Sequence, residues 1–213
     1  VDGIFTHFAR ADEPESGSTQ AQITLFKALL ADLEQAGLKP ATVHAANSAA
    51  IFNFPEAYFD LVRPGDILFG MAPSPSMKLW PDFRPALTWK ARLIAVHEFP
   101  AGHGISYGST YVTQKDEKIG VIPVGYGDGY RRIDHQVVLV GGKRVPVVGR
   151  VCMDQSMLQL DQVPQAHVGD EVILIGRQGD EEVTVDEVAQ RWGTINYEVT
   201  CGLADRLPRI YSE

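Results

Sequence analysis

Features that mark several specialised classes of protein are scarce in this chain. Cys152 and Cys201 are its only cysteines, too few for a disulfide framework, so a cytoplasmic protein with reduced thiols is expected. No apolar run approaches the roughly 18 residues that would predict a membrane span. The 19 basic residues are dispersed and outnumbered by 27 acidic ones, for a formal charge of -8. Nucleic acid is therefore not an expected partner.

The rest of the composition is that of a globular protein. Of the 213 residues, 45% are hydrophobic and 22% charged, which excludes collagen-like and disordered classes. The N-terminus is typical of a strand and has neither the basic nor the apolar region of a signal peptide. Because the chain begins at Val1, inside this strand-like stretch, we expect it to be part of something longer.

The first third alternates between strand-like and helix-like patterns. Strands are predicted at residues 3–8, 42–46 and 66–69, which implies parallel strands joined by right-handed crossovers. A helix is predicted from Thr19 to Leu38, with Ser18 or Thr19 as its N-cap and Gly37 at its end, and a short helix is predicted after Ser48. The expected buried stripe of the long helix consists of Ile23, Phe26, Leu29, Leu30 and Leu33.

A proline-rich stretch, residues 71–85, separates this part from a second one and is the best linker candidate. The second part is rich in β-type runs, so an antiparallel β domain, Greek key or barrel, is predicted. Gly141-Gly142 indicates a tight hairpin, and Thr184 with Glu187 predicts a capping box before a helix at 185–192. The β runs lie at residues 87–99, 106–113, 118–124, 136–140, 144–160 and 171–175.

Several local sequences could carry chemistry, and each also has a purely structural interpretation. The strand, turn and helix around Asn47-Ser48, together with Gly65, suit an anion such as phosphate, or form an ordinary N-cap and turn. His7, at the end of the first strand, is either a functional group or a core residue. No His or Cys cluster has metal-ligand spacing, so a metal site is not expected.

In the second part, tyrosines stand beside glycines in three unusual stretches, residues 106–111, 125–132 and 149–154. Their small neighbours could leave the phenol hydroxyls open to a ligand. The structural alternative is hairpin and bulge chemistry, for which Asp128-Gly129 is a common turn pair.

These stretches belong to a series of motifs that runs through the chain: Thr6-His7-Phe8-Ala9, His44-Ala45-Ala46-Asn47-Ser48-Ala49-Ala50, Val62-Arg63-Pro64-Gly65, Ser106-Tyr107-Gly108, Gly125-Tyr126-Gly127-Asp128-Gly129, Gly149-Arg150-Val151-Cys152-Met153-Asp154-Gln155, Asn196-Tyr197-Glu198 and Leu207-Pro208-Arg209. Taken in order, these motifs resemble bacterial alanine racemase. The resemblance covers essentially the whole chain and corresponds to the later part of that family's sequence. It implies the last strands of a (β/α)8 barrel that binds pyridoxal 5'-phosphate (PLP), residues 1–84, followed by a mainly antiparallel β-barrel-like domain, residues 85–213.

The resemblance also implies a reaction. Enzymes of this family interconvert L- and D-alanine by two-base proton transfer on a PLP aldimine, which supplies D-alanine for peptidoglycan. Tyr107 matches the base that a partner subunit contributes in the family's homodimer, His7 matches the residue linking that Tyr to Arg63, and Arg63 matches the contact to the pyridine nitrogen.

Further positions match the family's binding residues. Ser48, Gly65 and Asp66 correspond to phosphate-binding positions. Met153 and Tyr126 correspond to substrate-binding positions.

Three more residues, Asp12, Arg132 and Arg150, match polar positions along the entrance.

Two departures from the family pattern leave alternatives open. The family's PLP-binding Lys lies in a Lys-Ala-x-Ala-Tyr-Gly-His context that none of the seven lysines has, so this chain alone is expected to be inactive. Asp205 stands where some relatives place a Tyr near the phosphate, which leaves alanine and serine both open as substrate. A non-catalytic dimerisation or binding module is the third interpretation.

Overall fold

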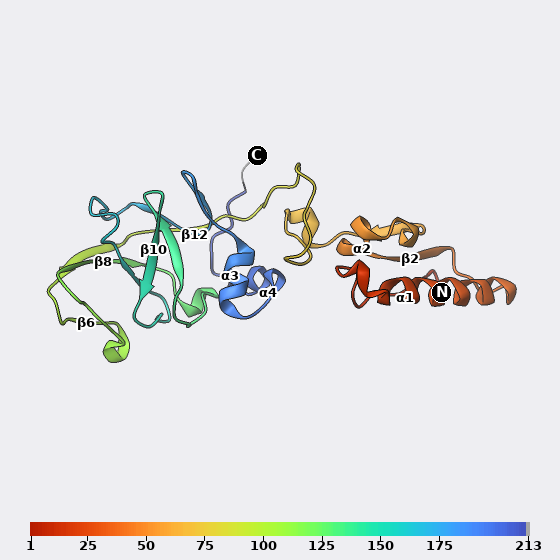
Figure 1. Cartoon of the computed structure of the whole chain (residues 1–213), viewed down its shortest axis with the longest axis horizontal. Helices are drawn as coiled ribbons and strands as arrows, with labels where there is room; N and C mark the ends of the chain where they lie inside the picture. The colour runs from red at the N-terminus through yellow and green to blue at the C-terminus, as the bar shows by residue number, and fades with distance from the viewer. Residues whose placement is uncertain (212–213) are drawn as a thin grey trace. The chain divides into compact units, whose positions relative to one another are not determined.

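The computed structural model describes residues 1–211 (Figure 1). The chain forms two compact units, one comprising Val1–Ala86 and the other beginning at Leu87. Among residues 1–211, no helix is both long enough and apolar enough to cross a membrane.

The first unit is built on a three-stranded parallel sheet in the order β1-β2-β3. Its strands are β1 (Gly3–Phe5), β2 (Thr42–Asn47) and β3 (Leu61–Arg63). Its helices are α1 (Ser18–Gln35) and α2 (Ser48–Asn53), with 3-10 turns at Pro14–Ser16, Pro55–Ala57 and Asp66–Phe69. Residues of α1, β2 and α2 form one buried cluster, so both helices pack on the sheet.

Helix α1 confirms the main features expected of it, with two corrections. Ile23, Phe26 and Leu30 are buried as predicted, whereas Leu29 is exposed, because it lies about 100° around the helix from Leu30. The N-cap is Gly17, in the left-handed conformation without a side-chain cap, rather than Ser18 or Thr19. At the other end, Gly37 has φ 69°, and the helix stops there as expected.

The third parallel strand lies earlier in the chain than predicted. It is β3, which ends at Arg63, while the predicted strand Asp66–Phe69 is a 3-10 helix. Pro64-Gly65 interrupts the strand, and Gly70, with φ 70°, closes the turn that follows. Arg63 is therefore the last residue of a parallel strand, where α/β sites gather.

The second unit contains an antiparallel sheet of eight strands in the order β13-β12-β9-β10-β11-β8-β5, with β4 also paired to β12. Only Leu93 and Ile94 separate β4 from β5, and β5 pairs with β8. One continuous stretch thus connects β12, the strand next to one end of the path, with β5 at the other end, as in a barrel. The strands are β4 (Trp89–Arg92), β5 (Ala95–Phe99), β8 (Glu117–Ile122), β9 (Val137–Val140), β10 (Lys143–Val148), β11 (Ser156–Gln159), β12 (Glu171–Gln178) and β13 (Glu181–Val183).

A parallel α/β unit followed by an antiparallel β unit is the fold class that the sequence predicted. Three predicted β runs are broken, however. Residues 87–99 divide into β4 and β5 at Leu93 and Ile94. Residues 106–113 form a 3-10 helix, Tyr107–Ser109, between the short strands β6 (Gly104–Ile105) and β7 (Tyr111–Val112). Residues 144–160 divide into β10 and β11 around an irregular loop. Strand β13 and helix α4 (Asn196–Cys201) were not anticipated.

Two local predictions on this unit concern its turns and caps. Gly141 and Gly142, with φ 56° and 72°, connect β9 to β10 as a tight hairpin, as predicted. Helix α3 (Val185–Trp192) begins after Thr184, whose hydroxyl oxygen accepts the Glu187 N–H at 3.1 Å. The capping box is only half formed, because the Glu187 carboxylate binds Arg144 and Arg191 instead.

Candidate functional site

In the first unit, polar side chains gather where the three parallel strands end. His7 follows β1, Asn47 ends β2 and Arg63 ends β3. The carboxyl ends of parallel strands lie at one edge of a sheet, so these side chains meet there. We call Arg63, His44, His7 and Asn47 the Arg63 cluster.

Arg63 is held by four contacts within the first unit. Its Nη2 donates to the Thr6 carbonyl at 3.0 Å and to the Ala45 carbonyl at 3.1 Å, and lies 3.3 Å from His7 Nδ1. Its Nη1 lies 2.6 Å from His44 Nδ1. Burial lowers the pKa of Arg63, but a guanidinium in a protein keeps its proton. The cluster therefore presents a fixed cation.

The participation of His44 was not anticipated from the sequence. Its ring stacks on Phe5, with centroids 5.2 Å apart and planes 2° from parallel, and the Arg63 guanidinium lies 5.4 Å from the centre of the same Phe5 ring. On the opposite side of the cluster, His7 Nε2 lies 3.4 Å from Asn47 Nδ2. The available signal was a His two residues before the end of the strand predicted at 42–46, and three residues before Asn47.

Ser48 and Gly65, both predicted to bind phosphate, are in direct contact. The Gly65 N–H donates to Ser48 Oγ at 2.8 Å, and Ser48 is buried. Asn47 also caps α2, since its Oδ1 accepts the Ala50 N–H at 3.0 Å. Asn47 is therefore an ordinary N-cap, as the structural interpretation predicted. The Ser48 hydroxyl is not used as a cap, and it retains a proton to donate while its oxygen accepts the Gly65 N–H. Asp66 follows directly, as the first residue of its 3-10 turn.

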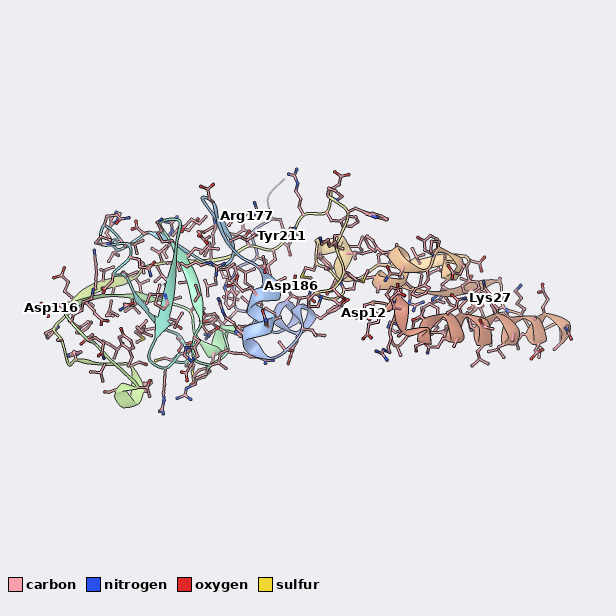
Figure 2. All side chains as sticks on the ribbon, in the orientation of Figure 1. Asp12, Lys27, Asp116, Arg177, Asp186 and Tyr211 are labelled. Atoms are coloured by element: carbon pink, nitrogen blue, oxygen red, sulfur yellow. The ribbon has the colours of Figure 1, made fainter. Side chains whose placement is uncertain are left out.

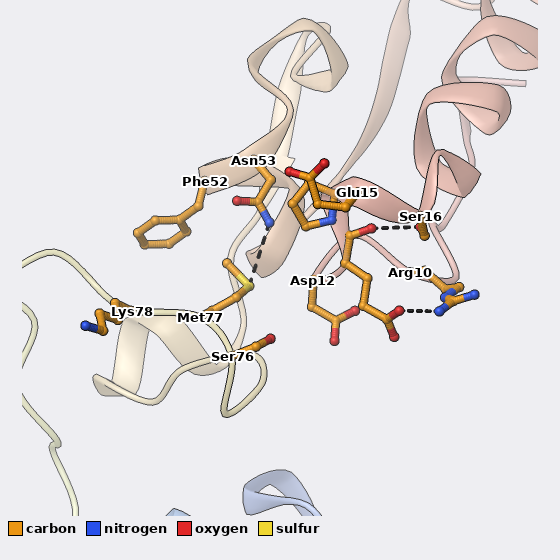
Figure 3. A pocket seen from close by; sticks show the side chains of 11 residues that line it. Arg10, Asp12, Glu15, Ser16, Phe52, Asn53, Ser76, Met77 and Lys78 are labelled. Carbon is orange, nitrogen blue, oxygen red and sulfur yellow. Dashed lines mark hydrogen bonds and ion pairs between the residues drawn. The ribbon is translucent and has the colours of Figure 1, made fainter.

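Asp12, expected along the entrance, lines a groove of about 750 Å³ within the first unit (Figure 3). Its neighbours there include Arg10, Glu13, Met77 and Lys78. Arg10 is ion-paired with Glu13, and the Asn53 amide contacts the Met77 sulfur at 3.9 Å. The groove is polar and of mixed charge.

In the second unit, three predicted site residues line one groove of about 780 Å³: Tyr107, Tyr126 and Met153. Their side chains are exposed, Tyr107 by 72%, Tyr126 by 45% and Met153 by 54%. They come from three separate stretches of chain, so the fold brings them together. We call this surface the Tyr107 groove; Ser106, Gly108, Cys152, Asp154, Gln155 and Met157 complete its lining.

Tyr107 stands in a strained segment. Ser106 has φ 64° and ψ -178°, a region essentially reserved for glycine. Its hydroxyl donates to the Arg150 carbonyl at 2.6 Å, which holds this backbone in place. The Arg150 guanidinium lies against Gly108, where an added Cβ would come 3.1 Å from Nη1. Predicted as an entrance residue, Arg150 is therefore next to Tyr107.

A buried polar network holds Tyr111, the first residue of β7, in the segment that follows Tyr107. Glu117, with an exposed fraction of 2%, accepts hydrogen bonds from the Tyr111 hydroxyl at 2.6 Å and from the Gln114 N–H at 2.8 Å. Gln159 Nε2 donates to both Tyr111 and Glu117. Burial, and then the neighbouring carboxylate, raise the pKa of Tyr111, so this phenol serves as a donor and structural support.

The loop bearing Tyr126 is fitted closely to the loop bearing Met153. The Tyr126 N–H donates to the Cys152 carbonyl at 3.0 Å and the Gly127 N–H to the Met153 carbonyl at 2.8 Å. A Cβ at Gly125 would come 2.2 Å from the Cys152 oxygen, so only glycine fits. The Met153 N–H has no acceptor among residues 1–211.

The remaining predicted residues lie on the surface. Arg132 is exposed and does not line the Tyr107 groove, and Asp205 is exposed in the segment after α4. Lys27 is on the exposed face of α1 (Figure 2), consistent with its exclusion as the PLP-binding lysine.

Comparison with known proteins identifies the family. The family model "Alanine racemase, C-terminal domain" matches residues 86–211, and "Alanine racemase, N-terminal domain" matches residues 1–73. Alanine racemase of Symbiobacterium thermophilum is 50% identical over 99% of this chain, and that of Halothermothrix orenii is 45% identical over 99%. The chain spans 56% of the length of each of these relatives.

Comparison with solved structures identifies the same family. Alanine racemase from Bacillus anthracis, crystallised with bound L-Ala-P, superposes with a TM-score of 0.95 at 42% identity, covering 99% of this chain and 55% of that one. The enzyme from E. faecalis gives 0.93 at 43% identity, covering 99% and 56%. The chain belongs to the alanine racemase family.

Proposed function

We propose that this chain provides part of a PLP-dependent alanine racemase: residues 1–84 contribute the last strands of its barrel and residues 85–213 its β domain. The observation that carries the proposal is the Arg63 cluster, in which a guanidinium is fixed by two backbone carbonyls and two imidazoles. A guanidinium held in this way, with Phe5 and two histidines beside it, is suited to donate a hydrogen bond to the nitrogen lone pair of a flat aromatic ring.

The residues of the first unit fit PLP. Ser48 Oγ accepts the Gly65 N–H at 2.8 Å, which orients the hydroxyl and leaves its own proton to donate to a phosphate. Gly65 carries no side chain to obstruct a close approach. Arg63 would donate to the pyridine nitrogen and, because it keeps its proton, would leave that nitrogen unprotonated. When bound, PLP makes the Cα proton of an amino acid acidic enough to remove.

The second unit supplies groups for the substrate. Tyr107, presented to solvent from a strained segment, would take or return the proton at Cα on one face through its phenol oxygen. The free N–H of Met153 would bind the substrate carboxylate, and Tyr126 would limit the size of the pocket. We propose that this unit serves a partner chain's first unit in a homodimer, with His7 linking the partner's phenol to Arg63.

Joining this chain to the N-terminal part of a curated relative tests the proposal. The joined protein should be yellow and should racemise L-alanine, while the present chain alone should do neither. A joined protein that folds but stays colourless and inactive contradicts the proposal. Rates on L-serine, measured alongside, decide between the two substrates.

Tyr107→Phe in the joined protein tests the assignment of the base. Exchange of the Cα proton with deuterated solvent should be lost for one enantiomer of alanine and retained for the other. Equal loss for both enantiomers would show that Tyr107 is not a one-sided base.

A further inference from the structure

The two loops that carry Tyr126 and Met153 are joined by a single arginine from the end of the chain. Arg206 Nε donates to Asp128 Oδ1 at 2.7 Å, and Arg206 Nη2 donates to Asp154 Oδ1 at 2.7 Å. Asp128 is two residues after Tyr126, and Asp154 is next to Met153. One planar guanidinium therefore connects three segments that are far apart in the sequence.

We propose that Arg206 is a positioning residue for the Tyr107 groove, which ties Asp128 to Asp154 and thereby fixes the Tyr126 side chain and the free Met153 N–H. The importance of those two groups for substrate rests on the proposed function. The connection between the loops does not.

The Asp128 end of the connection is built to be rigid. The Asp128 side chain is 7% exposed, and its second oxygen, Oδ2, accepts the Gly125 N–H at 2.9 Å. The Asp128 backbone takes part as well, since its carbonyl accepts the Ala204 N–H at 3.1 Å. Removing Arg206 would leave a buried carboxylate without its cation, a costly arrangement.

The Arg206 side chain is half exposed, but one side of its guanidinium packs closely against the loop at Gly127. A Cβ at Gly127 would come 2.7 Å from Arg206 Nη2 and 3.0 Å from the Met153 carbonyl oxygen. The absence of a side chain at Gly127 thus lets Arg206 lie flat against the loop. A lysine would carry the charge but could not reach two carboxylates from one planar group.

Charge adds a second effect at the groove. With Arg206, the three side chains sum to one negative charge; without it, two carboxylates stand beside the N–H proposed to bind a substrate carboxylate. Like charges at this range weaken binding. Loss of Arg206 is therefore expected to affect substrate affinity more than the proton-transfer step.

Amide hydrogen exchange on the 213-residue chain tests the connection between the loops. In Arg206→Gln, exchange at Gly125, Tyr126 and Gly127 should be faster by about tenfold or more, the effect of losing a hydrogen bond between charged groups. Asp154→Asn, a surface change with the Asp128 pair intact, should give a smaller acceleration in a chain that folds normally.

Arg144→Gln is the matched control. Arg144 also binds two acids, Glu181 and Glu187, within the second unit, but among residues 1–211 it makes no hydrogen bond or ion pair with either loop of the groove. Its loss should leave exchange at Gly125–Gly127 unchanged. The proposal is overturned if Arg206→Gln leaves these rates unchanged, or if Arg144→Gln accelerates them equally.

Kinetics of the joined protein test the substrate side. Arg206→Gln should raise KM for alanine several-fold and change kcat little, the pattern of a lost binding interaction, while Arg144→Gln should change neither. An unchanged KM in Arg206→Gln, in an enzyme that racemises alanine, would overturn this part of the proposal. If the joined wild type is inactive while the exchange results hold, the proposed function fails and the connection between the loops stands.

Discussion

His44 Nδ1 lies 2.6 Å from Arg63 Nη1, across the pairing of β2 with β3. Because an arginine side chain has donors and no acceptors, His44 Nδ1 must be the acceptor. The His44 ring is therefore oriented both by its stack on Phe5 and by the hydrogen bond from the Arg63 guanidinium. The presence of Arg63 thus determines which ring nitrogen of neutral His44 carries the proton.

This relationship predicts the His44 tautomer. In the neutral ring the proton should be on Nε2, and side-chain 15N spectra of the chain should show Nδ1 without a proton. In Arg63→Met the donor is gone, and both tautomers should be populated. A wild-type spectrum with the proton on Nδ1 would contradict the hydrogen-bond assignment.

The buried Glu117 predicts a dependence of stability on pH. Burial alone would raise the pKa of Glu117, but hydrogen bonds from Tyr111, Gln114 and Gln159 outweigh it and hold the pKa below its ordinary value. A lowered pKa in the folded state means that the contribution is complete above the unfolded pKa, about 4.3, and is lost as the pH falls through the folded value.

Urea denaturation between pH 3 and 7, with probes in the second unit, measures this contribution. Glu117→Gln should lower the free energy of unfolding at pH 7 by about 1.5–3 kcal/mol and flatten the decline toward acid pH. Asp180→Asn, at an exposed turn, is the control and should follow the wild type. A mutant curve parallel to the wild type would show that Glu117 does not titrate in this range.

The strained backbone of Ser106 predicts that its glycine variant is more stable than its alanine variant. Ser106→Gly loses the 2.6 Å hydrogen bond to the Arg150 carbonyl but relieves a conformation that costs about 1–3 kcal/mol for a residue with a side chain. Ser106→Ala loses the bond and keeps the strain. The glycine variant should therefore be more stable than the alanine variant by about that amount in urea unfolding, and equal stability would show that the backbone relaxes.

Gly125→Ala tests the fit between the Tyr126 and Met153 loops. The new methyl would collide with the Cys152 and Met153 carbonyl oxygens, so the loops must separate at a cost of about 1–3 kcal/mol. Methyl NMR of Met153 should shift. Gly179→Ala, which introduces backbone strain at φ 63° with no collision, the nearest atom to the new methyl being Gly142 Cα at 3.9 Å, should destabilise the chain without moving that signal.

Elements with strong local signals were predictable from the sequence. The stripe of α1, the N-cap of α3 and the Gly141-Gly142 hairpin depend on neighbours within a few residues. The predicted strand at 66–69, with only three apolar residues after Asp66, was ambiguous, because length and periodicity cannot separate a short strand from a helical turn. The break at Tyr107 was hidden, since it depends on a left-handed serine where glycine would be the usual signal.

The site residues likewise divide into those with a local sequence signal and those without one. Tyr107, Tyr126, Met153, Ser48 and Arg63 could be named from motifs, and the structure brings them together within their two units. The pairing of His44 with Arg63 requires knowing that β2 lies next to β3. The Arg206 contacts span 78 residues to Asp128 and 52 to Asp154, so no local pattern could reveal them.

The turn at Gly141-Gly142 has the handedness that mirror-image residues prefer, since both φ angles are positive. A D-alanine inserted there by semisynthesis should stiffen the hairpin where L-alanine would strain it. This turn could therefore report, through stability alone, which enantiomer of alanine has been built into the polypeptide.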